Sequence, residues 1–351
     1  MMRPGSIAKA LLNACGWLSM LAGICCGAQQ DQTPVFTLKV YANLVQVPTL
    51  VLDHDREPLR QIDFQRFQVS LDGGKQFAPT HVRMEGEDPL SLAILIDVGG
   101  KERSDLVAAL SGATAEMAAN YLHPQDRVSI YLLSCNLLRT VYQVHPSPEL
   151  LSTAIEKGLQ SPNFAKNSAG ASCGTKVFLW GAMTAVVKDM VDATGRRAIL
   201  VISNGRDDGS AVSWPQLHEY AGLEGVALFG LRDTPATPTG WQTDHVDVFR
   251  SLCESTGGIV MTGEKRDLQK RMQRWIDLLR GRYVVEFPRP QALSGGAHDI
   301  AISIKKDWMA FTTVAGVSVS MPDPKITTDP NYVPSDEGSD IPVGKRRPLR
   351  Q

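Results

Sequence analysis

The chain is poor in cysteine, almost neutral, and lacks the common cofactor motifs. Its 351 residues include only six cysteines, and none has the Cys-x-x-Cys or Cys/His spacing of a zinc site. A formal net charge of −1 provides no field that would attract nucleic acid or an anionic membrane. The phosphate loop, the dinucleotide-binding glycine fingerprint and a paired-carboxylate motif are also absent. These absences argue against zinc proteins, nucleotide-dependent enzymes and nucleic-acid-binding proteins.

An apolar stretch at residues 10–24 follows Arg3 and Lys9, and small residues up to Ala28 come after it. This pattern predicts a signal peptide at residues 1–28, removed before Gln29. We therefore expect a secreted, periplasmic or cell-envelope protein. Lipid attachment at a cysteine of this segment and an uncleaved membrane anchor are the alternatives.

Three cysteines remain after residue 28, namely Cys135, Cys173 and Cys253. An odd number allows at most one internal disulfide and leaves at least one thiol. A bridge between Cys173 and Cys253, or burial as small residues, is the simplest expectation. The alternative is a redox-sensitive thiol at Cys173.

Residues 92–100 form a continuous aliphatic run that ends on Asp97 and two glycines. A short apolar run without alternation is typical of a strand buried on both faces of a parallel sheet. An ionisable group at the carboxyl end of such a strand lies where open α/β sheets bind ligands. Asp97 is therefore the first candidate site residue.

Strand and helix patterns alternate from residue 89 to 281, which predicts a doubly wound, mostly parallel α/β sheet with helices on both faces. The expected strands are 90–97, 127–135, 138–144 as a hairpin edge, 197–203, 226–231 and 258–261. The expected helices are 104–122, 148–158, 175–193, 214–223, 246–255 and 268–279.

Both ends of the chain have β patterns instead. Residues 35–88 contain alternating stretches and an Asp72-Gly73-Gly74 turn, which predicts a hairpin between strands 67–71 and 77–84. Residues 282–321 contain three more alternating stretches, 283–287, 298–304 and 311–319. We expect the two ends to form one small β-sandwich. Residues 322–351 have no apolar period, which predicts a disordered tail.

This order of features resembles the von Willebrand factor type A domain, and in particular the exported bacterial proteins with a "VWFA-related" region. The resemblance extends over residues 44–322. It includes a strand followed by Asp72-Gly73 and the strand at 283–287 that leaves the type A domain. It implies a Rossmann-like doubly wound fold and a binding function.

Type A domains often hold Mg²⁺ or Mn²⁺ at the carboxyl end of the sheet, through Asp-x-Ser-x-Ser, a threonine and an aspartate in three loops. Asp97 matches the first aspartate and Thr175 matches the threonine, but Gly99 and Lys101 replace the two serines and Asn204 replaces the third-loop aspartate. A divalent cation needs several hard oxygen ligands. The resemblance therefore implies a degenerate metal site.

Three hypotheses remain for this degenerate site. Lys101 could replace the cation by pairing with Asp97, or Asp97 could simply cap the following turn. Asp207 and Asp208 could instead supply substitute oxygens for a metal.

A different hypothesis starts from Gly170-Ala171-Ser172-Cys173-Gly174, which satisfies the Gly-x-Ser-x-Gly pattern of serine hydrolases. His218, His245 and His298 follow in the chain as candidate bases. A nucleophile elbow needs a strand directly before the serine. The small, polar residues 162–169 do not predict one.

The sequence thus favours a non-enzymatic, exported adhesion-type module that binds a protein or an extracellular matrix component. We expect docking over the loops of Asp97, Thr175 and Asn204, with Trp241 as an exposed aromatic contact. The first alternative is a structural envelope scaffold with no ligand on these loops. The second is a hydrolase with Ser172 as its nucleophile.

Overall fold

The computed structural model describes residues 44–98, 103–161, 176–232, 247–288, 296–305, 307, 310–314 and 318–321. The chain divides into two units, and all of these residues belong to the second, Asn43–Gln351. The predicted signal peptide and the predicted C-terminal tail at 322–351 lie outside the described residues. None of the helices in the described part is both long and apolar enough to span a membrane.

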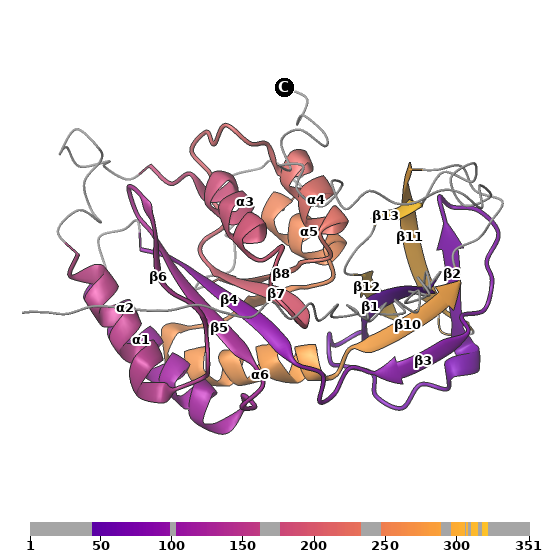
Figure 1. Ribbon diagram of the computed structural model, residues 1–351, viewed down its shortest axis with the longest axis horizontal. Coiled ribbons are helices and arrows are strands. Elements are labelled where there is room, and N and C mark those ends of the chain that lie inside the picture. The colour runs from indigo at the N-terminus through magenta and orange to yellow at the C-terminus, as the bar shows by residue number, and fades with distance from the viewer. Residues whose placement is uncertain are drawn as a thin grey trace, which may run out of the picture. The chain divides into compact units, whose positions relative to one another are not determined.

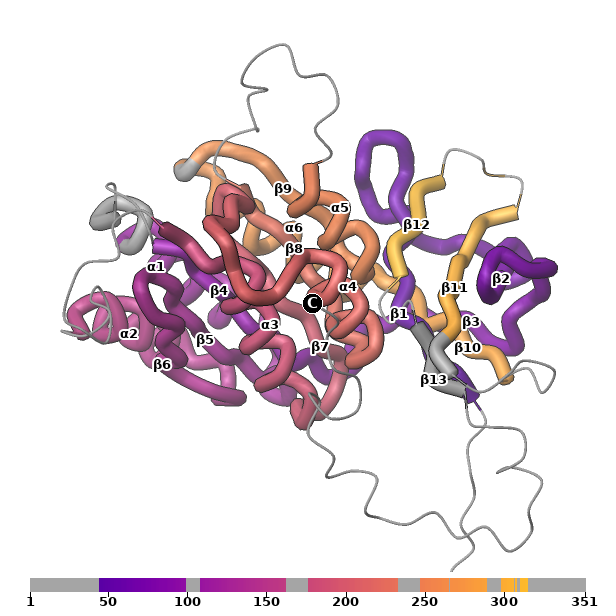
Figure 2. Tube along the Cα trace, turned by 90° about the horizontal axis from the view of Figure 1, so that it is seen from above, coloured from indigo at the N-terminus to yellow at the C-terminus, as the bar shows by residue number. Residues whose placement is uncertain are grey.

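A six-stranded sheet forms the centre of the structure (Figures 1 and 2). Its strands, in spatial order, are β6 (Leu137–Val144), β5 (Arg127–Leu133), β4 (Leu90–Asp97), β7 (Arg196–Ile202), β8 (Ala227–Arg232) and β9 (Val260–Thr262). All neighbours are parallel except β5 and β6. The chain enters at the middle strand and adds strands outward on both sides, which is the doubly wound order. The predicted fold class is confirmed.

In the part of the chain that the structure describes, six helices cover the two faces of this sheet. They are α1 (Arg103–Asn120), α2 (Pro148–Leu159), α3 (Leu179–Asp189), α4 (Trp214–Leu223), α5 (Val248–Ser255) and α6 (Leu268–Arg280). Leu92, Ile94 and Ile96 of β4 share a buried cluster with α1, α2 and α6. Ala93 and Leu95 belong to a second cluster with α3, α4 and α5. Because β4 is covered on both sides, its sequence is continuously apolar.

Strands from both ends of the chain form two smaller antiparallel sheets. The first has the order β12 (Phe311–Val314), β1 (Leu44–Leu52), β10 (Tyr283–Pro288), β3 (His81–Met84), and the second β13 (Ser318–Met321), β11 (Gly296–Ile304), β2 (Phe67–Leu71). One buried cluster contains residues of both sheets, among them Val47, Phe67 and Phe287. A 3-10 turn at Phe64–Arg66 precedes β2.

The predicted hairpin at Asp72-Gly73-Gly74 is wrong in its pairing. The turn forms, with positive φ at Asp72 and Gly73, but β2 and β3 join different sheets. Only Val69 and Phe77 exchange backbone hydrogen bonds before the two segments separate. The apolar residues of β2 are buried beside β11 instead, and this partner lies far away in the sequence.

The expected strand at 311–319 is also wrong as a single strand. It is two strands, because β12 pairs with β1 in one sheet and β13 pairs with β11 in the other. An alternating run of residues does not show whether the chain changes sheets within it.

A buried ion pair joins the two segments that connect the small sheets with the six-stranded sheet. Arg282, between α6 and β10, donates from Nε and Nη2 to the carboxylate of Glu85, between β3 and β4, at 2.8 and 2.7 Å. Both side chains are almost completely buried. Arg280 adds donations to the carbonyls of Gly86 and Asp88 and to the buried carboxylate of Asp126.

We expect Glu85→Ala to lower the free energy of unfolding by about 3–5 kcal/mol, because it leaves the charge of Arg282 buried and unpaired. Urea denaturation measures this loss. Glu57→Ala is the matched control: it removes the carboxylate of the exposed Glu57–Arg274 pair and should cost less than about 1 kcal/mol. Equal losses in the two variants would contradict the role of the buried pair.

Candidate functional site

The carboxyl ends of β4 and β7 lie next to each other, with Asp97 ending β4 and Ser203 directly after β7. Strands are added in opposite directions on either side of this point, which is where doubly wound sheets bind their ligands. Ser203 Oγ donates a hydrogen bond of 2.8 Å to Asp97 Oδ2. The predicted site residue Asp97 is therefore held by a neighbouring strand end, a contact that the sequence did not predict.

Asn204, which follows Ser203, is exposed, but its side chain holds its own loop. Its Oδ1 accepts a hydrogen bond from the Arg206 N–H at 2.9 Å. Gly205 has a φ of +81° and donates its N–H to Ser203 Oγ. A Cβ at Gly205 would lie 2.8 Å from atoms of Arg232 and Phe249, so only glycine fits there. The structure thus brings Asp97, Ser203 and Asn204 together.

Asp207 caps helix α3 from this loop. Phe178, at the N-cap position, makes no side-chain hydrogen bond to the helix. Instead, Asp207 accepts from the Trp180 N–H, and Ser210 Oγ accepts from the Gly181 N–H, both at 3.0 Å. The expected helix at 175–193 is correspondingly shorter, because its first turn begins where these acceptors are available.

Asp208 holds the segment that precedes α3. Its carboxylate accepts from the Val177 N–H at 2.9 Å and from the Arg206 guanidinium at 2.7 Å. The hydrogen bond from Val177 is the largest cause that lowers the pKa of Asp208. The hypothesis that Asp207 and Asp208 supply metal ligands is not supported, because the oxygens of both side chains already serve the protein's own donors.

An ion pair that the sequence did not suggest lies at the carboxyl end of β8. Arg232 is 5% exposed and donates from both terminal nitrogens to Asp247, at 2.8 and 3.0 Å. Asp247 also accepts from the Arg250 N–H, so it caps α5. The Arg232 hydrogen bond is the largest cause that lowers the pKa of Asp247. An arginine ending an apolar strand was the signal that could have revealed this pair.

The described residues at this edge of the sheet do not fit a divalent cation. Such an ion needs several hard oxygen ligands, normally six for Mg²⁺. Asp97 is bound by a hydroxyl and Asn204 by a backbone amide. Every other aspartate described above is engaged by amides or guanidinium groups. The other predicted site residues, Gly99, Lys101, Thr175 and Trp241, lie outside the described residues.

A second group of potential metal ligands is Asp53, His54 and Asp55, whose ligand atoms lie within 4.8 Å of one another. Asp53 Oδ1 accepts hydrogen bonds from the N–H groups of Asp55 and Glu57, both at 2.9 Å. His54 and Asp55 are largely exposed. These hydrogen bonds show that Asp53 stabilises the turn that follows β1, and the turn accounts for the closeness of the three side chains.

The described histidines among the candidate bases for Ser172 have other roles. His218 Nε2 lies 3.3 Å from the Ser255 carbonyl oxygen. His298 Nδ1 lies 2.6 Å from Asp72 Oδ2, at the end of β2. Ser172 and His245 are outside the described residues.

The cysteine expectation needs a correction. Cys253 is a free thiol in the core, so the expected Cys173–Cys253 bridge is wrong and the alternative, burial as a small residue, is confirmed for Cys253. Burial raises the pKa of Cys253, which keeps it protonated and unreactive. Cys135 is disulfide-bonded.

No family model matches the sequence, and no curated protein matches it. Among solved structures, the chain is similar to proximal thread matrix protein 1 from the mussel byssus, with 11% identity and a TM-score of 0.44 over 60% of this chain and 50% of that chain. A form of the same protein with a zinc-occupied MIDAS motif has 12% identity and a TM-score of 0.43, over 60% and 49%. The chain thus covers about half the length of these structures. Its own sheet has the doubly wound order, with one antiparallel edge strand, that the sequence predicts.

We expect Asp207→Ala to lower the free energy of unfolding at pH 7 by about 1–2 kcal/mol, because α3 loses its cap. Burial raises the pKa of Asp207, but hydrogen bonds from Ser210, Trp180 and Gly209 outweigh it and hold the pKa below its ordinary 3.8. The ionised form is therefore favoured by folding, and its stabilisation is lost as the pH falls through the lowered pKa.

Thermal melts between pH 2 and 7 test this linkage. Asp207→Asn cannot titrate, so its melting temperature should fall less steeply in acid than that of the wild type. The exposed Asp192→Asn should keep the wild-type slope, and an identical slope in all three proteins would contradict the assignment.

Cys173 is the one cysteine left as a partner for Cys135 if residues 1–28 are removed. We therefore expect a Cys135–Cys173 peptide in a non-reduced digest analysed by mass spectrometry. Cys253 should react with iodoacetamide only after denaturation, because it is fully buried. Labelling of Cys253 in the folded protein would contradict its burial.

Proposed function

We propose that the protein is an exported binding module of the type A class, similar to the bacterial VWFA-related proteins, with a ligand face that works without a metal ion. The observation that carries this proposal is the Ser203–Asp97 hydrogen bond at the switch point of the sheet. The Ser203 hydroxyl donates this hydrogen bond to the carboxylate of Asp97, the residue that matches the first metal ligand of a complete type A site.

The aspartates at this edge of the sheet hold the backbone in place, which supports a binding function over a catalytic one. Asp207, Asp208 and Asp247 each hold a loop or a helix end, which gives a preorganised surface. Ser203 lies beside a carboxylate, but it is 7% exposed, and His218 and His298 contact other parts of the described chain. The described residues of this edge therefore offer no activated nucleophile.

Side chains suited to contact a partner surround the same loop. Arg206 is 65% exposed, and Trp214, at the first position of α4, is 36% exposed. Arginine and tryptophan are enriched among residues that dominate binding energy at protein interfaces. We infer that the partner is a protein or an extracellular matrix component that docks on Asn204, Arg206 and Trp214, with Trp241 as a further contact.

Two observations support export. The N-terminal segment has the pattern of a signal peptide, and Cys135 is disulfide-bonded. Disulfides persist mainly in oxidising compartments outside the cytosol.

An envelope scaffold is the second candidate. It is favoured by the two small sheets, which bury an apolar cluster of their own and give the chain a second potential contact region. In that case the loops at the carboxyl edge would have no ligand.

Thermal shift measurements with millimolar Mg²⁺ or Mn²⁺ test the absence of a metal. We expect no change in melting temperature, because the described carboxylates at this edge of the sheet already accept hydrogen bonds from the protein itself. A type A domain with an intact Asp-x-Ser-x-Ser loop, measured in parallel, should be stabilised. A saturable stabilisation of this protein that Asp97→Asn abolishes would overturn the metal-free site.

Binding to immobilised matrix proteins tests the ligand face. We expect Trp214→Ala to weaken binding at least tenfold and EDTA to leave it unchanged. Phe64→Ala is the matched control, because Phe64 is an exposed aromatic residue in the turn before β2. Binding that survives Trp214→Ala, Arg206→Ala and Asp97→Asn, with the fold intact by circular dichroism, would favour the scaffold.

A further inference from the structure

The two edges of the six-stranded sheet are protected to different degrees. β9, at one edge, has three residues, whereas β6, at the other, has eight and pairs only with β5 among the described strands. Proteins usually shorten edge strands or place charges and prolines on them, because an open edge can pair with another strand. β6 has no proline, and its one charged residue, Arg139, is neutralised by Asp189 at 2.9 Å.

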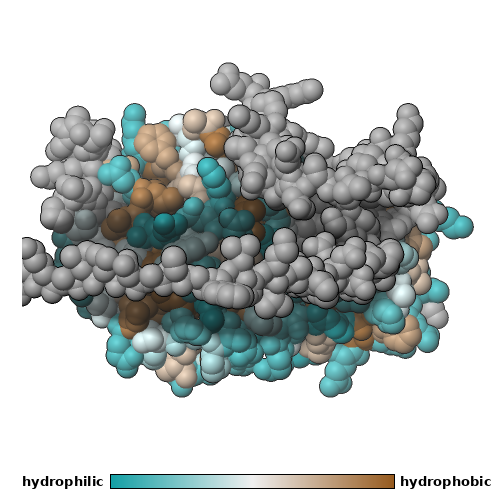
Figure 3. Space-filling view, in the orientation of Figure 1, coloured by the Kyte–Doolittle hydropathy of each residue, from teal (hydrophilic) through white to brown (hydrophobic). Residues whose placement is uncertain are grey.

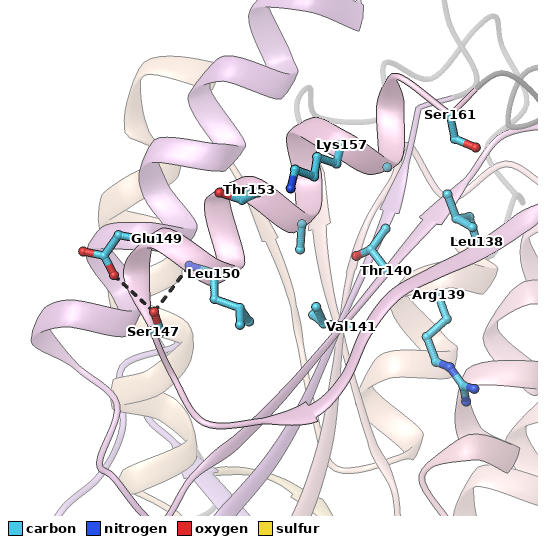
Figure 4. Close-up of a pocket in the computed structure, with 12 residues that line it drawn as sticks. Leu138, Arg139, Thr140, Val141, Ser147, Glu149, Leu150, Thr153, Lys157 and Ser161 are labelled. Carbon is cyan, nitrogen blue, oxygen red and sulfur yellow. Dashed lines mark hydrogen bonds between the residues drawn. The ribbon is translucent and has the colours of Figure 1, made fainter. Parts of the chain in front are cut away.

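A groove of about 680 Å³ runs between β6 and α2 (Figure 4). Gly158 allows the close approach of the two elements, because a Cβ there would lie 2.5 Å from side-chain atoms of Leu132 and Thr140. Leu150 at the rim is 41% exposed, and Leu138 and Val141 are only partly buried. In the space-filling view, apolar residues gather on the part of this face where Figure 1 draws β6 and α3 (Figure 3).

The helix beside the groove carries opposite charges at its two ends. Glu149 lies in the first turn of α2 and Lys157 in the last turn. With Thr153 midway between them, they follow one stripe of the helix over about 12 Å. Glu149 accepts a hydrogen bond from Ser147, but neither charge has an oppositely charged partner within the described chain.

We propose that β6 and α2 form a homodimer interface in which β6 pairs antiparallel with β6 of a second copy. A two-fold axis at this edge reverses the direction of α2 in the partner. Glu149 of each copy then faces Lys157 of the other, and Thr153 faces Thr153 across the axis. The surface is self-complementary, as a two-fold interface requires. This charge pattern favours a second copy over an unrelated extended peptide.

The geometry of β6 limits the length of the pairing. Gln143 has a φ of +49°, and the register between β5 and β6 shifts near Val128, Ile130 and Tyr131. On β6 these shifts fall at Thr140 and at Tyr142–Gln143, so only residues 137–139 keep a regular register and the edge offers few backbone hydrogen bonds. The contacts of α2 therefore decide the register, and we expect a dimer that dissociates on dilution.

Sedimentation equilibrium of the purified protein between 1 and 100 µM tests the proposal. We expect a monomer–dimer equilibrium that weakens with salt. Lys157→Glu and Glu149→Lys should each raise the dissociation constant at least tenfold, because each places like charges together. The double variant Glu149→Lys/Lys157→Glu should restore the dimer. Lys270→Glu, in α6, is the matched control and should change nothing, because Lys270 is exposed on a helix that does not contact β6 or α2.

Cross-linking locates the axis independently. Thr153→Cys should form a covalent dimer under mild oxidation, and Lys270→Cys should not. A monomer at all concentrations would overturn the proposal. A dimer that tolerates both single charge reversals and gives no Thr153→Cys cross-link would also overturn it, since the copies would then meet elsewhere. Neither outcome would affect the proposed ligand face, which uses the other loops.

Discussion

The structure depends on the burial of one strand, β4, between two layers of helices. Leu92, Ile94 and Ile96 are on one face and Ala93 and Leu95 are on the other, all completely excluded from solvent. A strand of this kind must lie in the middle of a sheet, with neighbours on both sides. The other described strands of this sheet and the described helices are arranged around it, and its carboxyl end becomes the switch point where Asp97 is placed.

Polar groups at that end of the sheet are used to hold the loops. Ser203 binds Asp97, Asp207 caps α3 from another loop, and Arg232 is paired with the capping residue of α5. Each contact satisfies a buried or partly buried group that would be costly to leave unpaired. The same contacts engage carboxylate oxygens of the described residues, and this is the basis of the proposal that the ligand face works without a metal ion.

Several elements could be predicted from sequence because their patterns are local. The helix Trp214–Leu223 was predicted to the residue, and the strands of the large sheet to within one or two residues. The predicted hairpin at Asp72 and the single strand at 311–319 failed for a common reason. Turn residues and alternation indicate that a strand begins or ends, but they do not identify its partner.

The sequence by itself determined the doubly wound sheet, its central strand and the position of Asp97 at the strand end, because burial on both faces requires a continuous apolar run. Only the tertiary structure decided that Ser203 would bind Asp97, that Asp207 would cap a helix 27 residues earlier in the chain, and that β6 would leave an open edge beside α2. These features are contacts between segments distant in sequence. They depend on how packed elements meet in space, and no local pattern of residues records that.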